Sequence, residues 1–146
     1  MGVRVFSLAL IAVVCVTTGA CDEALSNLTG PTENLTPTFS SIQRDILSAS
    51  DSSGRIPCTN CHNGNTFVPG NFTGSAAYAS LVGVPSVQRP ALMRVAPGNP
   101  DASYLIHKLD GGPNIVGLQM PRVGVSLGDG QIRVIRRWIE LGAKND

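Results

Sequence analysis

The stretch RIPCTNCHNGN, residues 55–65, holds two cysteines separated by two residues and a histidine directly after the second cysteine. Cys58, Cys61 and His62 therefore lie close together in any local conformation of this segment. The spacing is compatible with a redox-active dithiol, with half of a zinc site, or with an anchor for a covalently attached cofactor. The rest of the chain has to distinguish these possibilities, because so short a pattern occurs in all three.

A dithiol or a zinc site needs surroundings that this sequence does not supply. A thioredoxin-like dithiol has its first cysteine at the start of a helix that follows a strand, within a βαβ unit, and the sequence shows no such unit. A structural zinc ion needs a tetrahedral set of ligands. Apart from the motif itself, only His107 could contribute, and no second pair of cysteines or histidines follows at finger spacing.

The remaining interpretation is covalent attachment of a c-type haem. Such a haem needs two cysteine sulfurs for thioether bonds to its vinyl groups, followed by a histidine that reaches the iron from one face. Two intervening residues make about one turn of helix, which brings both sulfurs to one haem edge. Because CTNCH meets each requirement, the sequence predicts one covalently bound haem c, held by Cys58, Cys61 and His62.

The second axial ligand has three candidates, which are Met120, Met93 and His107. Met120 lies in LQMPR, in a loop bounded by glycine and proline before the last predicted helix. A rigid Met-Pro step in a loop can direct a thioether toward iron without being part of a helical core. Met93 is interpreted as a packing residue near a turn, and His107 as a surface residue on the polar side of a helix. Met120 is therefore the favoured ligand.

The start of the chain is typical of an exported protein. After Arg4, the apolar run Val5–Val16 is too short for a comfortable membrane span, so residues 1–20 are predicted to be a signal peptide. The segment VTTGAC resembles the lipobox of bacterial lipoproteins, with small residues directly before Cys21. We expect cleavage before Cys21 and lipidation of Cys21, which would consume an otherwise unpaired thiol. Plain secretion with an incidental Cys21 is the alternative.

The mature chain is expected to consist of a tether and one domain. Residues 21–37 are polar and rich in threonine, asparagine and proline, which is typical of a flexible tether, and residues 38–146 form the domain. A net charge of +1 without a basic run makes nucleic acid an unsuitable partner. With 5% aromatic residues, 16 glycines and 10 prolines, the domain has a small core and benefits from a large apolar cofactor.

Four segments of the domain have the apolar periodicity of short helices. In the first, over about 39–50, Ser40 or Ser41 can cap the helix, and Ile42, Ile46 and Leu47 share one face. The others are predicted over 75–82, from Pro100 or Asp101 to Gly111, and over 129–142. The apolar side of the last consists of Ile132, Ile135, Trp138, Ile139 and Gly142. Because no stretch alternates with period two, the fold class is all-α, with long loops that contain glycine and proline.

The segments CTNCH, GNPDASYLIHKLDGG and LQMPRVG, followed by LGDGQIRVIRRWIELGAKN, resemble the single-haem class I type cytochrome c domains of exported bacterial proteins, including planctomycete-type cytochrome c modules. The resemblance covers about residues 39–143. It implies a small cytochrome c-like fold of about four to five short helices around one haem. It also implies that Cys58 and Cys61 bind haem covalently, and that His62 and Met120 are the axial ligands.

The same resemblance implies how the helices pack. The first and last helices are expected to cross beside the haem, so that Ile42 and Ile46 meet Ile135, Trp138 or Ile139. Trp138 is then interpreted as a core residue. The chain departs from the family pattern at Gly128, where a serine or threonine usually caps the last helix.

Four arginines are possible partners of the haem propionates on the basis of charge. They are Arg55, Arg89, Arg94 and Arg122. The sequence does not rank them, and a solvated surface position is the default expectation for each.

These features predict a carrier of single electrons that is not an enzyme. A haem with histidine and methionine on its two faces has no open position for a small-molecule substrate. The expected partners are redox proteins, and a lipid anchor would tether the domain to a bacterial membrane on its periplasmic side, or leave it soluble in the periplasm if lipidation does not occur. The alternative function is a haem-based sensor or an accessory haem subunit of a larger redox complex, with a labile sixth ligand.

Overall fold

The computed structural model describes residues 34–65 and 67–146. The predicted signal peptide, the lipidation site Cys21 and the tether up to residue 33 lie outside the described residues. Leu35, near the end of the predicted tether, is only 2% exposed and belongs to the hydrophobic core, so the packed part of the chain begins before residue 38. Within the described ranges, no helix has the length and apolarity needed to cross a membrane.

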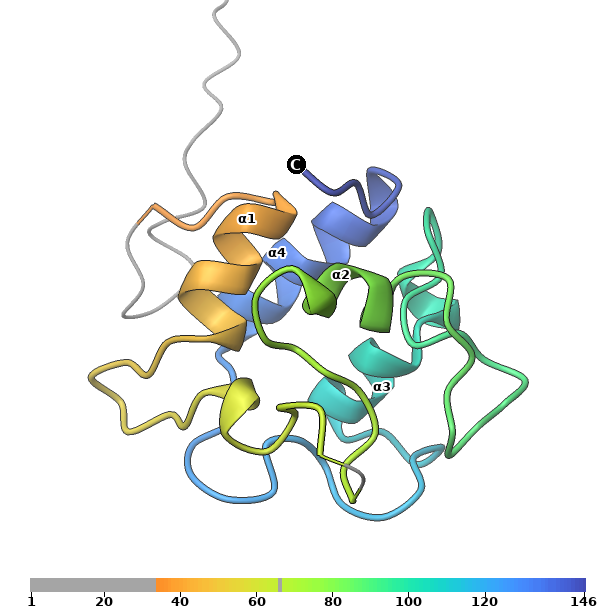
Figure 1. Ribbon diagram of the computed structural model, residues 1–146, viewed down its shortest axis with the longest axis horizontal. Helices are drawn as coiled ribbons and strands as arrows, with labels where there is room; N and C mark the ends of the chain where they lie inside the picture. Colours follow the sequence, from red (N-terminus) through yellow and green to blue (C-terminus); the bar gives the residue numbers. More distant parts are fainter. Residues whose placement is uncertain (1–33, 66) are drawn as a thin grey trace, which may run out of the picture.

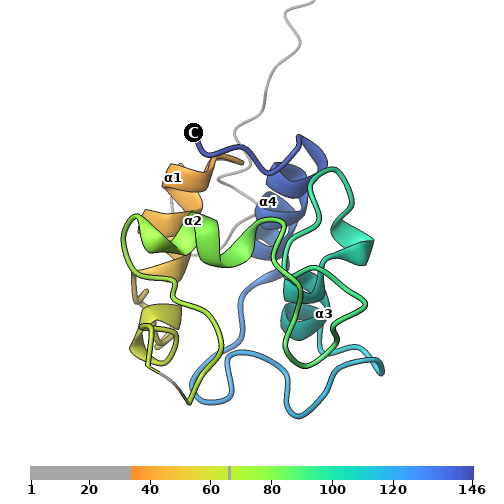
Figure 2. The same cartoon turned by 45° about the vertical axis from the view of Figure 1, so that its right-hand side comes forward.

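The described residues form helices and loops without a named strand, which confirms the all-α prediction. The helices are α1 (Phe39–Ile42), η2 (Gln43–Leu47, a π-helix), η3 (Cys58–Asn60, a 3-10 helix), α2 (Ala76–Leu81), η4 (Pro100–Ala102, a 3-10 helix), α3 (Tyr104–Asp110) and α4 (Asp129–Glu140). Figures 1 and 2 show α1, α2 and α4 gathered at one end of the molecule, with α3 beside them. The loops around residues 55–70 and 113–128 form the opposite end.

The first predicted helix corresponds to α1 and η2, which run on without a break over residues 39–47. Its cap is not Ser40 or Ser41, as predicted, but Thr38, whose Oγ1 accepts a hydrogen bond from the amide of Ser41 at 3.3 Å. The Ser41 hydroxyl is instead used inside the helix, where it donates to Asp45 at 3.0 Å. The predicted apolar face is confirmed, because Ile42, Ile46 and Leu47 are all buried.

The third predicted helix is interrupted. It is divided into η4 and α3 by Ser103, which has an extended backbone. The amides of Tyr104 and Leu105 donate to the carbonyl groups of Met93 and Arg94, at 2.9 Å each, instead of continuing the helix from residue 100. The predicted end is confirmed, since Gly111 adopts a left-handed conformation with φ 71° and closes α3.

The last helix, α4, packs against α1 and contributes four residues to the core. The residues expected to meet there, Ile42, Ile46, Ile135, Trp138 and Ile139, belong to one buried cluster. The predicted apolar side is partly wrong, because Ile132 is only half-buried and Gly142 is exposed, whereas Val134 and Gln131 are buried. Gln131 supplies the other half of a capping box, since its side-chain oxygen accepts a hydrogen bond from the amide of Gly128 at 3.1 Å.

Candidate functional site

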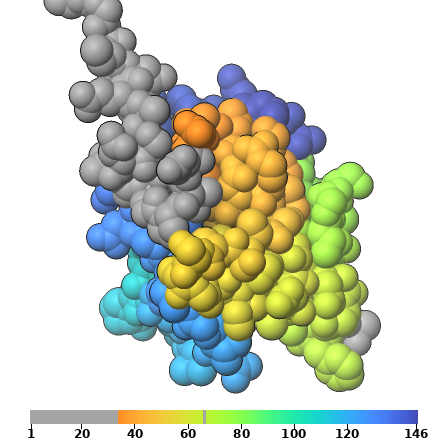
Figure 3. Space-filling view, turned by 90° about the vertical axis from the view of Figure 1, so that its left-hand side faces the viewer, coloured from red at the N-terminus to blue at the C-terminus, as the bar shows by residue number. Residues whose placement is uncertain are grey.

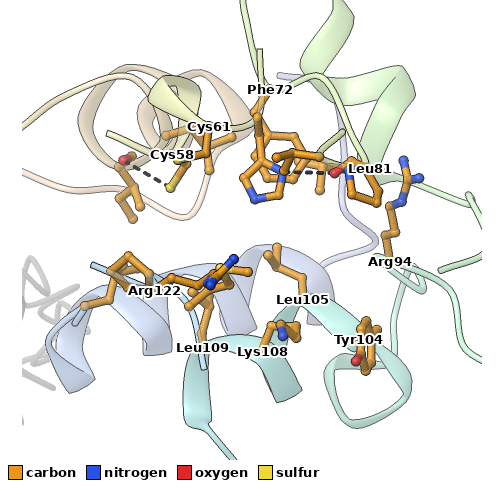
Figure 4. Close-up of a pocket in the computed structure, with 18 of the residues that line it drawn as sticks. Cys58, Cys61, Phe72, Leu81, Arg94, Tyr104, Leu105, Lys108, Leu109 and Arg122 are labelled. Atoms are coloured by element: carbon orange, nitrogen blue, oxygen red, sulfur yellow. Dashed lines mark hydrogen bonds between the residues drawn. The ribbon is translucent and has the colours of Figure 1, made fainter. Parts of the chain in front are cut away.

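A cavity of about 530 Å³ lies between the two loops and the helices, within the size range of cofactor sites. Cys58, Cys61, His62 and Met120 all line it, so the structure brings the four predicted site residues together. In Figure 4, Cys58, Cys61, Phe72 and Leu81 form one wall, and the opposite wall holds Leu105, Lys108, Leu109 and Arg122. Most of the lining is aliphatic or aromatic, which is suited to a flat apolar molecule.

The two loops that contribute to this cavity contact each other beside it. Gly124 has φ 82°, and a Cβ atom there would lie 3.2 Å from the side chain of Ile56 and 3.4 Å from the carbonyl oxygen of Gly54. Figure 3 shows the segment around residue 55 in contact with the segment that precedes α4. The left-handed backbone and this tight contact therefore both favour glycine at position 124.

The two cysteines and the histidine are arranged by a single turn. Pro57 precedes η3, and the amides of Cys61 and His62 both donate to the carbonyl oxygen of Cys58, at 3.2 Å and 2.9 Å. Both cysteines are free thiols, with Cys58 half-buried and Cys61 exposed. The predicted single turn is therefore present, and all three of its residues, Cys58, Cys61 and His62, line one cavity.

The surroundings of Cys58 do not suit a reactive dithiol. Burial raises the pKa of the Cys58 thiol, and the nearby charge of Arg55 offsets this only in part. Nucleophilic cysteines have a lowered pKa, because the thiolate is the reactive form. Within residues 34–65 and 67–146, no three histidine, cysteine or acidic side chains gather where they could hold a metal ion.

His62 is held in one orientation by contacts that sequence reasoning missed. Its Nδ1 donates to the carbonyl oxygen of Pro69 at 2.9 Å, and its ring stacks on Phe72 with centroids 4.4 Å apart and an interplanar angle of 13°. Since a carbonyl can only accept, Nδ1 carries the proton and Nε2 keeps its lone pair. Burial lowers the pKa of His62, with Arg94 and Lys108 adding to this and the Pro69 bond opposing it. No sequence pattern marks Pro69 or Phe72 as partners.

Met120 is half-buried and packs against the core from the loop that follows α3. Its amide donates to the carbonyl oxygen of Lys108 at 2.7 Å, and the neighbouring side chain of Gln119 donates to the carbonyl oxygen of Leu109 at 2.6 Å. Both bonds attach the loop to the C-terminal end of α3. The sulfur-bearing residue is therefore held by the helix next to the cavity.

The other two ligand candidates do not line this cavity. Met93 is 42% exposed. His107 is half-buried in a separate hollow beside Arg136, where its Nε2 bonds to the carbonyl oxygen of Asp101 at 2.7 Å. Of the three candidates for the second axial ligand, only Met120 reaches the cavity that contains His62.

The four arginines occupy different environments. The surface expectation is wrong for Arg55, which is 1% exposed and donates to Asp51 and to the carbonyl oxygens of Asp45 and Ile46. Arg89 is exposed and does not line the cavity, whereas Arg94 and Arg122 do. Arg94 is half-buried and donates to the carbonyl oxygen of Ser80 at 2.7 Å.

The charged residues that line the cavity are all basic. They are Arg94, Lys108 and Arg122, and no acidic side chain of the described residues lies among them. Such a lining favours a ligand that is mainly apolar but carries negative groups at its margin. Two thiols, a free imidazole nitrogen, a thioether and this basic margin fit a haem with its two vinyl groups and two propionates.

Comparisons of the chain with family models, with curated proteins and with solved structures found no match. The resemblance to single-haem cytochrome c domains therefore rests on the sequence motifs alone.

Proposed function

We propose that this chain is a single-haem c-type cytochrome domain that transfers one electron at a time between redox proteins. The observation that carries the proposal is the convergence of Cys58, Cys61, His62 and Met120 on one apolar cavity. Cys58, Cys61 and His62 come from one turn and Met120 comes from a different loop, and the other two candidates for the second ligand do not line the cavity. Two thiols, an imidazole and a thioether are together the groups that a covalently attached, six-coordinate haem requires.

Each of these residues has a defined role in the proposal. Cys58 and Cys61 hold the haem by thioether bonds, and His62 and Met120 are its axial ligands. When bound, the haem supplies an iron that alternates between the ferric and ferrous states. His62 offers Nε2 because its Nδ1 is hydrogen-bonded to Pro69, and the stacked ring of Phe72 keeps the imidazole from rotating. The soft thioether of Met120 favours the ferrous state, compared with a second histidine.

The remaining lining residues contribute burial and charge. The apolar side chains exclude water, so that little solvent reorganises when the charge changes. Arg94 and Arg122 are the arginines placed to neutralise the propionates, because they line the cavity and Arg55 and Arg89 do not. With both axial positions occupied by side chains, no position is left for a substrate, and we therefore propose an electron carrier that is not an enzyme.

The margin of the cavity suits a short-lived contact with a redox partner. Phe67 is 92% exposed, Leu118 60% and Val123 60%, and all three line the cavity. A small apolar surface of this kind fits the weak, low-area contacts of electron-transfer complexes. Export, and a lipid anchor at Cys21 that would tether the domain to the periplasmic side of a membrane, complete the proposal. Both rest on the sequence of residues 1–21.

The test is an optical spectrum of the protein produced together with haem-attachment machinery, first oxidised and then reduced. The oxidised protein should show the weak far-red charge-transfer band of methionine-ligated ferric haem, and the band should vanish in Met120→Ala. Met93→Ala is the matched control, since this methionine is exposed and does not line the cavity. Failure to bind haem covalently would refute the proposal. Stable binding of carbon monoxide by the reduced wild-type protein would point instead to a sensor with a labile ligand.

A further inference from the structure

Lys108 is a charged residue in an unusual place. Its relative exposure is 7%, although it lies on a short helix of a small domain and lines the cavity. Burial lowers the pKa of its amine, and the nearby charge of Arg122 does so further. A buried lysine costs free energy unless its donors are satisfied, so the partners of this amine indicate what it does.

The amine of Lys108 bonds to the loop that leads to Met120. Nζ donates to the carbonyl oxygen of Val116 at 3.0 Å and to that of Leu118 at 2.5 Å. The side chains of Val116 and Leu118 are themselves exposed, 44% and 60%, so apolar burial does little to hold this part of the loop. Hydrogen bonds to α3 therefore provide most of the attachment of this part of the loop.

The main chain of the same residue completes the attachment. The carbonyl oxygen of Lys108 accepts the amide of Met120 at 2.7 Å, so one residue of α3 binds the loop at positions 116, 118 and 120. A further bond from the amide of Val116 to the hydroxyl of Tyr104 lies one turn earlier on the same helix. The side chain of Lys108 therefore binds the backbone at residues 116 and 118, before Met120, and the carbonyl group of Lys108 binds the amide of Met120 itself.

We propose that Lys108 is a positioning residue that fixes the 116–120 loop on α3 and thereby keeps the Met120 thioether at the cavity. Its role in haem coordination rests on the proposed function, whereas its role in holding the loop does not. Without the amine, the loop loses two bonds from a charged donor, and Met120 should leave the cavity more often. With haem bound, Lys108 would thereby help to keep Met120 within reach of the iron.

The test compares Lys108→Met, which keeps an unbranched side chain but removes the donors, with Lys144→Met at an exposed lysine. The first measurement is amide hydrogen exchange. Peptides from residues 113–122 should exchange at least about tenfold faster in Lys108→Met, because two charge-assisted bonds are lost, while peptides from α4 should not change. Unchanged exchange over residues 113–122 would overturn the proposal. If protection falls throughout the domain, Lys108→Gln takes its place; its shorter, uncharged side chain should weaken the same two bonds, and faster or unchanged exchange over residues 113–122 is read in the same way.

The second measurement reads the coordination state. In Lys108→Met, the far-red band of the oxidised protein should weaken, and the reduced protein should bind carbon monoxide at least about tenfold more tightly than wild type. In a Met120→Ala background, Lys108→Met should add nothing, because the residue acts through Met120. An equal effect in both backgrounds, or none in either, would overturn the coordination role. Absence of haem from the wild-type protein would refute the proposed function and leave the exchange result to decide the role in the loop.

Discussion

Replacing Arg55 by methionine tests how much a buried guanidinium with three hydrogen-bond acceptors contributes to stability. The guanidinium donates to Asp51 at 2.9 Å, to the carbonyl oxygen of Ile46 at 2.7 Å and to that of Asp45 at 3.1 Å. The two carbonyls belong to η2, so Arg55 closes this helix just before the chain enters the CTNCH turn. The substitution keeps most of the apolar side chain but leaves one carboxylate and two carbonyls without this partner.

The expected cost follows from these three bonds. Hydrogen bonds from a charged donor contribute about 1.5 kcal/mol each, which sums to about 4.5 kcal/mol for the three, and removal of one partner from a buried ion pair costs about 3–5 kcal/mol. Although the side chain of Asp51 is only 8% exposed, it can regain water in the variant because it lies next to the exposed residues 52–54. We therefore expect Arg55→Met to lower the free energy of unfolding by about 3 kcal/mol.

Urea denaturation followed by circular dichroism measures this cost, and an unchanged slope would show that the unfolded state is comparable. Arg44→Met is the matched control. Arg44 also pairs with a carboxylate, Asp45, at 2.7 Å, but its side chain is 68% exposed, so its loss should cost less than about 1 kcal/mol. A cost below about 1 kcal/mol for Arg55→Met would show that water replaces the guanidinium, and the reasoning would be wrong.

Three further predictions concern stability. Burial by itself would raise the pKa of Asp51, but hydrogen bonds from Ser53 and Arg55 outweigh it and lower the pKa to about 2. The stabilisation of the fold by ionised Asp51 is therefore complete above the unfolded pKa of about 4 and is lost as the pH falls from about 4 to 2. Allowing for screening by solvent, we expect the free energy of unfolding to fall by about 1 kcal/mol over this range. An acid titration of unfolding measures this loss, which should be absent in Asp51→Asn. Gly111→Ala should lower the free energy of unfolding by about 1–2 kcal/mol in thermal unfolding, since φ is 71° at this position and the new Cβ would lie 2.5 Å from the side-chain oxygen of Gln119. A neutral result would contradict the attachment of the Met120 loop to the end of α3. Gly128→Ser should stabilise α4 by a few tenths of a kcal/mol, because Gly128 has cap geometry with open space for a side chain, and a destabilised variant would show that the cap residue has another role.

The local features of this protein could be predicted from its sequence. The CTNCH turn, the left-handed end of α3 at Gly111 and the buried face of Ile42, Ile46 and Leu47 all depend on residues a few positions apart. Such features follow from backbone conformational preferences and from the period of a helix, which act within one or two turns. The proposal of Met120 as a ligand likewise starts from a local pattern, because a Met-Pro step in a loop can be recognised without knowledge of the fold.

The tertiary structure decided which distant residues meet. Arg55 looked like a surface arginine in sequence, and it is buried because the carbonyls at the end of η2 and Asp51 supply its partners. The break at Ser103 arises because the amides that follow it bond to residues 93 and 94, which override the local preference for helix. Likewise, the orientation of His62 depends on Pro69 and Phe72, and the attachment of Met120 depends on a lysine from another element. Hydrogen bonds and ring contacts between segments that are distant in sequence have no local pattern, so only the folded chain shows them.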